Sequence, residues 1–290
     1  MADLIELIKV LRDRTGAGLM DCKGALLAND NDVEKASDWL REKGLAKAAK
    51  KASRIAAEGL ALVKACECGC ATCIAEVNCE TDFVAKGDAF KALVMSTIDE
   101  ILKTRPTTVE AAKDLTSSLY ADGTVKMGEK LDLRRFEVIE KQGDQAIYSY
   151  IHMGGKIASV VVLEKEDAEL GKGLAMHIAA NNPLYMTASD ISADEIEHEK
   201  AIQMELVKND PKLVNAPADR LEKILEGKVN KHFVDMVLDA QAYLLDDSKT
   251  VGTALKEKAN KVVKFVRYQV GEGIEKRQDD FASEVMSQVK

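Results

Sequence analysis

The sequence contains few aromatic residues and few histidines. Only 4% of its 290 residues are aromatic, with six Phe and one Trp, and it has four His. We therefore expect a core built mainly from Ala, Leu, Val and Ile, which suits packed helices. The length suggests two domains, or three small pieces, with enough chain to bury a core.

The sequence also lacks a long apolar run and an excess of positive charge. No stretch of 18 apolar residues is present, which argues against a membrane-spanning helix. The N-terminus carries acidic residues where a signal or transit peptide has none, so we predict a cytoplasmic protein. The net charge of −8 argues against nucleic acid as the main partner, although it allows a local basic patch.

Motifs for catalysis and nucleotide binding are absent as well. The sequence has no GxxxxGK(S/T) phosphate loop, no GxGxxG after a strand and no GxSxG. His198 has no second His four residues later, which excludes a zinc-protease helix. We interpret His198 and His232 as solvated, His177 as a core residue, and His152 as a strand end that can present its ring outward. We predict that the protein is not an enzyme and uses no cofactor.

Six cysteines are present, and four of them lie within residues 66–73. The cluster surrounds Gly69, which we expect near the tip of a β-hairpin. It contains one CxxC pair, whereas a strong zinc signal requires two separated pairs. We favour reduced thiols on a small hairpin, with a metal site or a regulated disulfide as the alternative. The six residues are Cys22, Cys66, Cys68, Cys70, Cys73 and Cys79.

Residues 3–44 predict three short helices. Leucine and isoleucine in the first follow the helical spacing i, i+3, i+4, i+7, and the glycines of TGAG end it. The second helix ends at NDND. Asp32 caps the third, which we expect to end at Gly44.

A cationic stripe follows in residues 43–54, if that segment is helical. We interpret it as a solvated linker helix, with RNA binding as the alternative. The stripe consists of Lys43, Lys47, Lys50, Lys51 and Arg54.

From residue 58 the pattern changes to the period of two that is typical of strands. Residues 59–78 predict a hairpin, and residues 88–103 a helix that covers it. Residues 134–165 predict three antiparallel strands with turns at Gly143–Asp144 and Gly154–Gly155, again followed by a helix. Strands followed by a helix, twice over, indicate a pseudo-repeated α+β core. We assign residues 105–130 as the connection between its halves.

The sequence of the C-terminal third predicts a pair of long helices, after which the chain rejoins the core. Residues 190–240 are mostly polar helix broken by Pro211 and Pro217, which favours two projecting antiparallel helices. A short helix near 249–258, a strand at 261–270, a loop and a last helix follow. The predicted domains are 1–54, 55–133, 134–189 with 241–270, 190–240 and 271–290.

The segment TDFVAK raises a question about Phe83. If Thr81 caps one helix that continues to residue 103, Phe83 shares a face with Phe90 and belongs to the core. If the helix begins after Gly87–Asp88 instead, Phe83 can leave the core and act as an interface anchor beside the Asp82 carboxylate. Periodicity favours the first alternative but does not decide between them.

The segment EVNCETDFVAK at 76–86 resembles a signature of the bacterial elongation factor Ts family, the nucleotide exchange factors of elongation factor Tu. LRDRTGAGLMDCKGAL at 11–26 resembles the other signature, and HIAANNP and SKTVG with FVRYQVGEGIEK extend the similarity over essentially the whole chain. Gly24 and the cysteine cluster depart from the family pattern.

The resemblance implies an α+β fold with an N-terminal three-helix, ubiquitin-associated-like module, a protruding antiparallel coiled coil and a C-terminal helical arm. It implies that the partner is elongation factor Tu, nucleotide-free and GDP-bound, with no direct contact to nucleotide. It leaves open a homodimer or a 2:2 complex.

The resemblance also implies which residues contact the partner. Asp82 and Phe83, with Thr81 and Val84, would wedge between two helices near the partner's Mg²⁺ site. The other implied contacts are Arg12, Leu19 and Met20 in the N-terminal module, together with Gly128, His152, Leu244 and Leu245.

Overall fold

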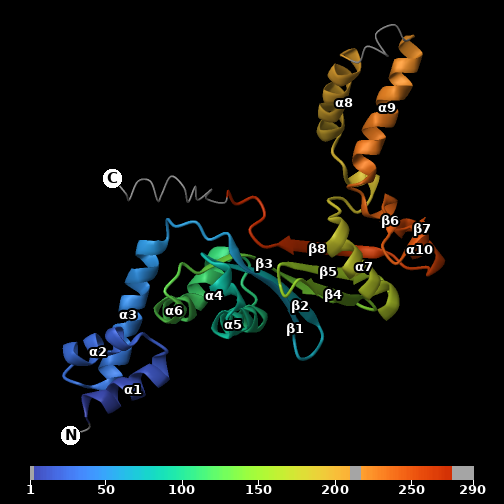
Figure 1. Cartoon of the computed structure of the whole chain (residues 1–290). Coiled ribbons are helices and arrows are strands. Elements are labelled where there is room, and N and C mark those ends of the chain that lie inside the picture. The colour runs from blue at the N-terminus through green and yellow to red at the C-terminus, as the bar shows by residue number, and fades with distance from the viewer. Residues whose placement is uncertain (1–2, 210–216, 276–290) are drawn as a thin grey trace. The chain divides into compact units, whose positions relative to one another are not determined.

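The computed structural model describes residues 3–209 and 217–275 (Figure 1). The chain divides into two compact units. One contains Met1–Glu140, Ile151–Ala158 and Tyr268–Lys290, and the other contains Lys141–Tyr150 and Ser159–Arg267. The class is α+β: helices combine with small antiparallel sheets. Among the described residues, no helix has the length and apolarity needed to cross a bilayer.

Three helices form the N-terminal region, as the sequence predicts: α1 (Leu4–Thr15), α2 (Leu19–Ala28) and α3 (Val33–Lys51). Gly16 ends α1 with φ of 67°, a left-handed conformation that glycine adopts without strain. The Asp32 carboxylate caps α3 by accepting from the N–H groups of Glu34 and Lys35 at 3.0 and 3.1 Å. Leu11, Leu26 and Leu40 are among the side chains buried between the three helices.

The prediction that Gly44 ends the third helix is wrong, because α3 continues through it to Lys51. Gly44 is buried, and a Cβ there would lie 2.7 Å from the Ala121 carbonyl oxygen and 2.7 Å from Val125 Cγ2. The missing side chain therefore lets α3 approach α6 (Val109–Met127) closely. Helix α6 lies in the segment 105–130, which the sequence analysis assigned only as a connection.

The first sheet has the order β1-β2-β3, with β1 (Glu58–Ala65), β2 (Ala71–Cys79) and β3 (Asp132–Glu140) antiparallel. Every residue of β2 is buried, because it is the central strand. Helix α5 (Asp88–Thr104) contributes Phe90 and Ile98 to the core, where they join Val77 of β2 and Leu133 of β3. The short helix α4 (Asp82–Lys86) connects β2 to α5.

The second sheet has the order β4-β5-β8, with β4 (Ala146–His152), β5 (Ile157–Leu163) and β8 (Val262–Gln269). The three strands predicted within 134–165 all form, but the first of them, β3, pairs with β2 in the other sheet. The second sheet takes its third strand from the C-terminal β8. Helix α7 (Ala168–Asn181) packs on it through Leu174 and Ile178, which cluster with Val161 and Leu163.

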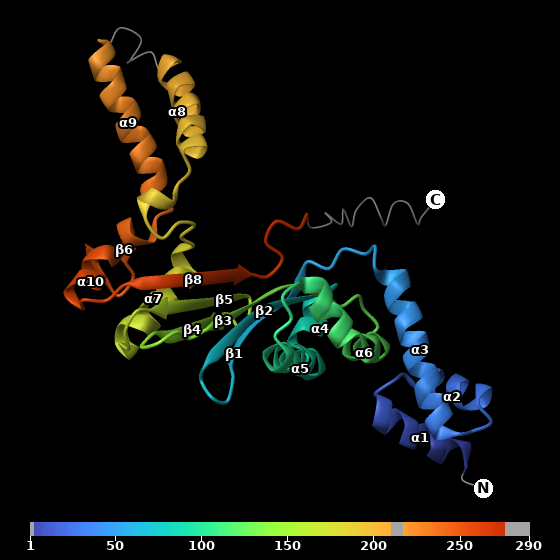
Figure 2. The same ribbon diagram turned by 180° about the vertical axis from the view of Figure 1, so that it is seen from behind.

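Helices α8 (Ala193–Lys208) and α9 (Ala218–Val234) lie side by side and run in opposite directions (Figure 2). Pro211 lies outside the described residues. The remaining elements are η1 (Ala188–Asp190), η2 (Leu238–Ala240), β6 (Ala242–Tyr243), β7 (Asp246–Thr250) and α10 (Val251–Glu257), the last at the predicted position. The predicted final helix lies outside the described residues.

Candidate functional site

Helix α4 consists of little more than one turn. Because it is too short to continue into α5, the Phe83 side chain stays outside the core. Thr81 caps α4, and its hydroxyl oxygen accepts from the Val84 N–H at 3.4 Å. Gly87, with extended backbone, ends α4 and begins α5. The continuous helix that would bury Phe83 is therefore wrong. Phe83 is 85% exposed, whereas Phe90 is fully buried.

The rest of α4 is attached to the protein. Ala85 is buried and Val84 is partly buried, and both belong to the apolar cluster between the first sheet and α5. The Val84–Ala85 side of the turn thus packs inward while the neighbouring phenyl ring is in solvent. We infer that the ring is presented on a fixed support.

Asp82 makes an ion pair with Lys86, one turn later on the same helix. The distance from Lys86 Nζ to Asp82 Oδ2 is 2.6 Å; the Lys86 side chain is largely exposed and that of Asp82 about half exposed. The hydrogen bond from Lys86 lowers the pKa of Asp82 below its usual 3.8, and the charges of Lys86 and Lys156 lower it further. The carboxylate beside Phe83 is therefore ionised at neutral pH.

Glu129, which the sequence analysis did not propose, holds the segment before α4. Its carboxylate accepts from the N–H groups of Glu80 and Thr81 at 3.0 Å each, and from the Thr81 hydroxyl at 2.5 Å. It follows Gly128, the predicted contact that ends α6 with φ of 74°. The only sequence signal for Glu129 is that it adjoins Gly128.

A second set of charged residues, Glu80, Lys130 and Arg54, adds to the contacts made by Glu129. The Glu80 carboxylate accepts from the Lys130 N–H at 2.6 Å and is 3.2 Å from the Arg54 guanidinium. The Lys130 ammonium donates to the carbonyl oxygens of Ala52 and Arg54 at 2.7 and 2.8 Å. The end of β2, the end of α6 and the segment after α3 are thereby fixed to one another.

The predicted contacts of the N-terminal module lie where α1 ends and α2 begins. Arg12 is exposed in the last turn of α1. Leu19 and Met20 open α2 and are 54% and 73% exposed. Exposed apolar and Arg side chains are typical of surfaces that bind another protein.

The other predicted contacts lie at the ends of strands. His152 ends β4 and is exposed, next to the turn at Gly154–Gly155. Leu244 and Leu245 are exposed between β6 and β7.

The position of the Leu244 backbone depends on His177. His177 Nδ1 accepts from the Leu244 N–H at 3.2 Å, while Nε2 bonds to Gln241 Oε1 at 2.7 Å. Burial lowers the pKa of His177, which keeps the ring neutral. His177 is thus the satisfied core histidine that the sequence predicts.

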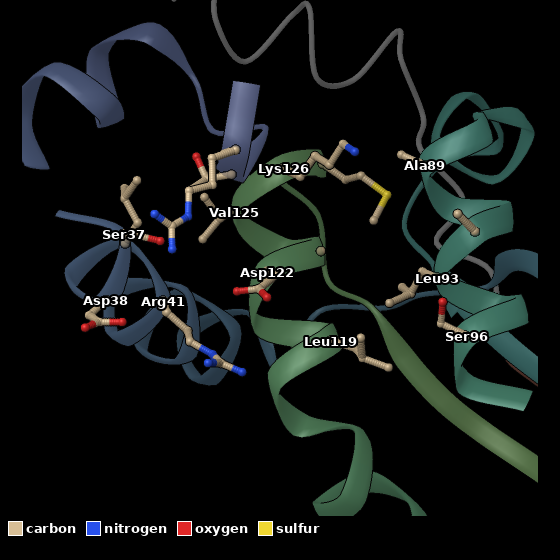
Figure 3. Close-up of a pocket in the computed structure, with 16 residues that line it drawn as sticks. Ser37, Asp38, Arg41, Ala89, Leu93, Ser96, Leu119, Asp122, Val125 and Lys126 are labelled. Atoms are coloured by element: carbon tan, nitrogen blue, oxygen red, sulfur yellow. The ribbon is translucent and has the colours of Figure 1, made fainter. Parts of the chain in front are cut away.

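A cavity of about 440 Å³ lies beside α3, α5 and α6 (Figure 3). Asp38 and Arg41 from α3 and Asp122 from α6 line its polar side, and Leu93 and Leu119 its apolar side. Met127, which the family resemblance implies with Gly128 as a weaker contact, lines it, but no other residue predicted to contact the partner does. No Cys or His occurs among the described residues around it. It therefore plays no part in the candidate site.

Comparison with known proteins gives the family. The family model described as elongation factor TS matches residues 80–272. Elongation factor Ts of Lactiplantibacillus plantarum is 45% identical over 292 residues, covering 98% of this chain and 97% of that protein.

The chain belongs to the elongation factor Ts family. It is therefore a nucleotide exchange factor for elongation factor Tu in translation elongation. The family match begins at Glu80, so it includes α4 with Phe83, and it ends at Glu272, after β8. The N-terminal helices lie outside that match but within the similarity to the relative.

The family assignment does not explain the cationic stripe at 43–54. Contacts within the chain explain most of its cations. Lys43 lies over the Trp39 ring at 3.7 Å, and Lys47 pairs with Asp21 at 3.2 Å. Lys51 donates to the Gly128 carbonyl oxygen, and Arg54 pairs with Glu80. Four of the five cations are thus engaged within the chain, which weakens the RNA-binding alternative.

Proposed function

We propose that this chain releases GDP from elongation factor Tu by inserting the Phe83 ring between two helices of the nucleotide-binding domain, next to the Mg²⁺ site. Asp82 would fix where the ring enters. The observation that carries the proposal is the 85% exposure of Phe83 on an anchored turn. Leaving a phenyl ring in water forgoes about 1.5–3 kcal/mol of burial, which the complex can recover.

A displaced helix is enough to weaken the metal site of the partner. Mg²⁺ requires nearly ideal octahedral geometry with ligands at about 2.0–2.1 Å. In nucleotide-binding GTPases the ion bridges the phosphates and is held by side chains of the protein. A shift of one helix by about an ångström therefore disrupts its coordination and loosens GDP.

The wedge works only if its support is stiffer than the partner that it opens. The hydrogen bonds of Glu129 to Glu80 and Thr81, and the packing of Val84 and Ala85, attach α4 to the first sheet and α6. Contact energy then deforms the partner rather than α4. No acid, base or nucleophile is needed, which agrees with a factor that catalyses no chemical step.

Exchange follows from reciprocal coupling. If the factor binds nucleotide-free elongation factor Tu more tightly than the GDP-bound form, then GDP weakens the binding of the factor by the same ratio. GTP, which is in cellular excess, binds the open site and expels the factor. The same cycle needs no direct contact between this chain and the nucleotide.

The remaining predicted contacts would supply affinity. We propose that Arg12, Leu19 and Met20 dock the N-terminal module on the nucleotide-binding domain, and that His152 and Leu244–Leu245 contact other parts of the partner. The protruding coiled coil at 190–240, the C-terminal arm at 271–290, the cytoplasmic location and a homodimer or 2:2 complex stay predictions of the family resemblance.

Stopped-flow release of labelled GDP from elongation factor Tu tests the wedge. We expect Phe83→Ala to lower the release rate by at least about tenfold, the factor that corresponds to 1.4 kcal/mol. Binding to nucleotide-free elongation factor Tu should change much less. Leu206→Ala removes another exposed apolar side chain, on α8, and should release GDP at the wild-type rate. A wild-type rate for Phe83→Ala contradicts the wedge.

The alternative function, RNA or ribosome binding through the stripe at 43–54, has a separate test. A mobility shift with transfer RNA or ribosomal RNA, in the absence of any protein partner, would support it if the shift weakens steeply with salt. We expect no such shift, since the contacts of the stripe are made within the chain.

A further inference from the structure

Three cysteines converge at the tip of the β1–β2 hairpin, a feature that nucleotide exchange does not use. The sulfurs of Cys66, Cys68 and Cys70 all lie within 4.8 Å of one another. The Cys66–Cys68 distance is 3.2 Å and the Cys66–Cys70 distance is 3.4 Å. All three are free thiols, and the tip is accessible to solvent.

The backbone of the tip produces this convergence. Cys66 N–H donates to the Ala71 carbonyl oxygen at 2.8 Å and closes the loop. Within it, Gly69 N–H donates to the Cys66 carbonyl oxygen at 2.9 Å, with φ of 67° at Gly69. This conformation suits glycine, and it turns the chain tightly enough for three alternate side chains to meet on one side.

The surroundings favour negative charge on Cys66 and place a cation beside Cys70. The Ala71 N–H donates to Cys66 Sγ at 3.1 Å, and the Arg105 guanidinium lies 3.5 Å from Cys70 Sγ. Desolvation opposes ionisation of Cys66, but hydrogen bonds from Cys68, Ala71 and Cys70 outweigh it and lower its pKa to about 7. The pKa of Cys70 is raised by its hydrogen bonds with Cys68 and Cys66.

The other nearby cysteine does not belong to the cluster. Cys73 is buried in the apolar core under α5, and burial raises the pKa of its thiol to about 12. A thiol of that kind is a core side chain rather than a ligand. The accessible sulfur donors at the tip are therefore the three cysteines of CECGC.

We propose that Cys66, Cys68 and Cys70 bind one thiophilic d¹⁰ metal ion, Zn²⁺ or Cu⁺, through three thiolates at the hairpin tip. Thiolates are the ligands that select these ions. Zn–S bonds of about 2.3 Å in tetrahedral geometry put sulfurs about 3.8 Å apart, close to the separations in the metal-free tip. Zn²⁺ would keep a fourth position open to water. As each metal–sulfur bond forms, the thiol releases its proton to solvent, so binding tightens as the pH rises.

The site lies away from the wedge. The tip precedes the first residue of β2, and α4 follows its last, so nine strand residues separate them. At about 3.3 Å per residue this is roughly 30 Å. Nucleotide exchange therefore serves as an independent check that a variant is folded, and the metal proposal does not depend on the wedge.

The test uses the reduced full-length chain titrated with Cd²⁺, whose thiolate charge-transfer absorption counts the ligands. We expect one equivalent bound through three thiolates. Competition with chelators of known affinity for Zn²⁺ and for Cu⁺ then identifies the preferred ion. Cys68→Ser should weaken binding by at least about 100-fold, since even an outer-shell partner of a metal ligand contributes roughly 10–100-fold. Glu67→Gln, an exposed change within the same tip, should leave it unchanged.

Several results would overturn the proposal. No saturable binding of any of the three ions would do so, as would half an equivalent per chain, which means an ion shared between two copies. Equal affinity of wild type and Cys68→Ser would also do so. So would a disulfide between two of the three cysteines, found by mass spectrometry, in a chain that binds no metal after reduction. Wild-type exchange by Cys68→Ser excludes misfolding as the cause of lost binding.

Discussion

Helices α4 and α5 each carry one phenylalanine near their start, and the two have opposite surroundings. Phe83 and Phe90 are seven residues apart, so an unbroken helix would bring them to the same face. Phe83 is 85% exposed and Phe90 is fully buried. The interruption at Gly87 makes the difference. One break in a helix thus converts a core position into a surface anchor.

Two acids in the same stretch differ in a similar way. Glu76 is fully buried in β2 and accepts from the side chains of Arg134 and Arg135 and from the Gly271 N–H, at 3.0, 2.6 and 2.8 Å. Asp82 is about half exposed, and its carboxylate accepts from Lys86 on the same helix. The buried members of both pairs hold the fold, and the exposed members are the ones that we propose to contact the partner.

The largest expected effect is a loss of stability on truncating the buried ring. Phe90→Ala should lower the free energy of unfolding by about 3–5 kcal/mol, because it leaves a cavity between α5 and the first sheet. Phe83→Ala should change it by no more than about 0.5 kcal/mol. Urea denaturation of the two variants measures both. Equal losses would mean that the ring at 83 is buried in the free protein.

The second prediction concerns the buried acid, Glu76, whose charge is removed by substitution. Glu76→Gln should lower the free energy of unfolding by about 1.5–3 kcal/mol, the usual contribution of a hydrogen bond to a charged group. The amide cannot accept from two guanidinium groups and a backbone N–H as a carboxylate does. Asp82→Asn is the matched control, and we expect no measurable change in its denaturation midpoint. A stable Glu76→Gln variant would show that the carboxylate charge is not needed there.

Local sequence patterns predict the elements with strong apolar periodicity but not those built from small residues. Helix α1, with its Leu and Ile stripe, and the short helix α10 form where the sequence places them. Helix α6 was missed because its buried positions are Ala, Thr and Gly, such as Ala112, Thr116 and Gly123, which give no leucine stripe. For the same reason Gly44 was interpreted as a helix end rather than a packing position.

Contacts between residues far apart in the sequence could not be predicted either. The register that joins Ala71 to Glu140 crosses almost seventy residues, and no local pattern specifies it. Phe83 and Asp82 are predicted as site residues only by resemblance to a family, since periodicity favours a buried ring. Glu129 has no local signal beyond its position next to Gly128, because its role arises only when the end of α6 meets the end of β2.

The third prediction tests whether the support of α4 matters for exchange. Glu129→Gln keeps the size of the side chain but weakens its bonds to the N–H groups of Glu80 and Thr81, by about 1 kcal/mol. We expect GDP release to slow by several-fold although Phe83 is present. Glu110→Gln, an exposed change at the other end of α6, is the control. An unchanged rate for Glu129→Gln would mean that the ring needs no rigid base.

The smallest expected effect concerns the exposed acid and its partner on α4. Lys86→Ala removes the hydrogen bond that is the main cause of the lowered pKa of Asp82. The pKa should therefore rise toward 3.8, which titration of the carboxyl carbon by nuclear magnetic resonance measures. The contribution of the pair to stability is present above pH 3.8 and is lost as the pH falls through the lower, folded-state pKa. At neutral pH the carboxylate stays ionised in the variant, so GDP release should remain close to wild type. A large loss of exchange would instead assign Lys86 a direct contact with the partner, and the anchor would then extend over the whole of α4.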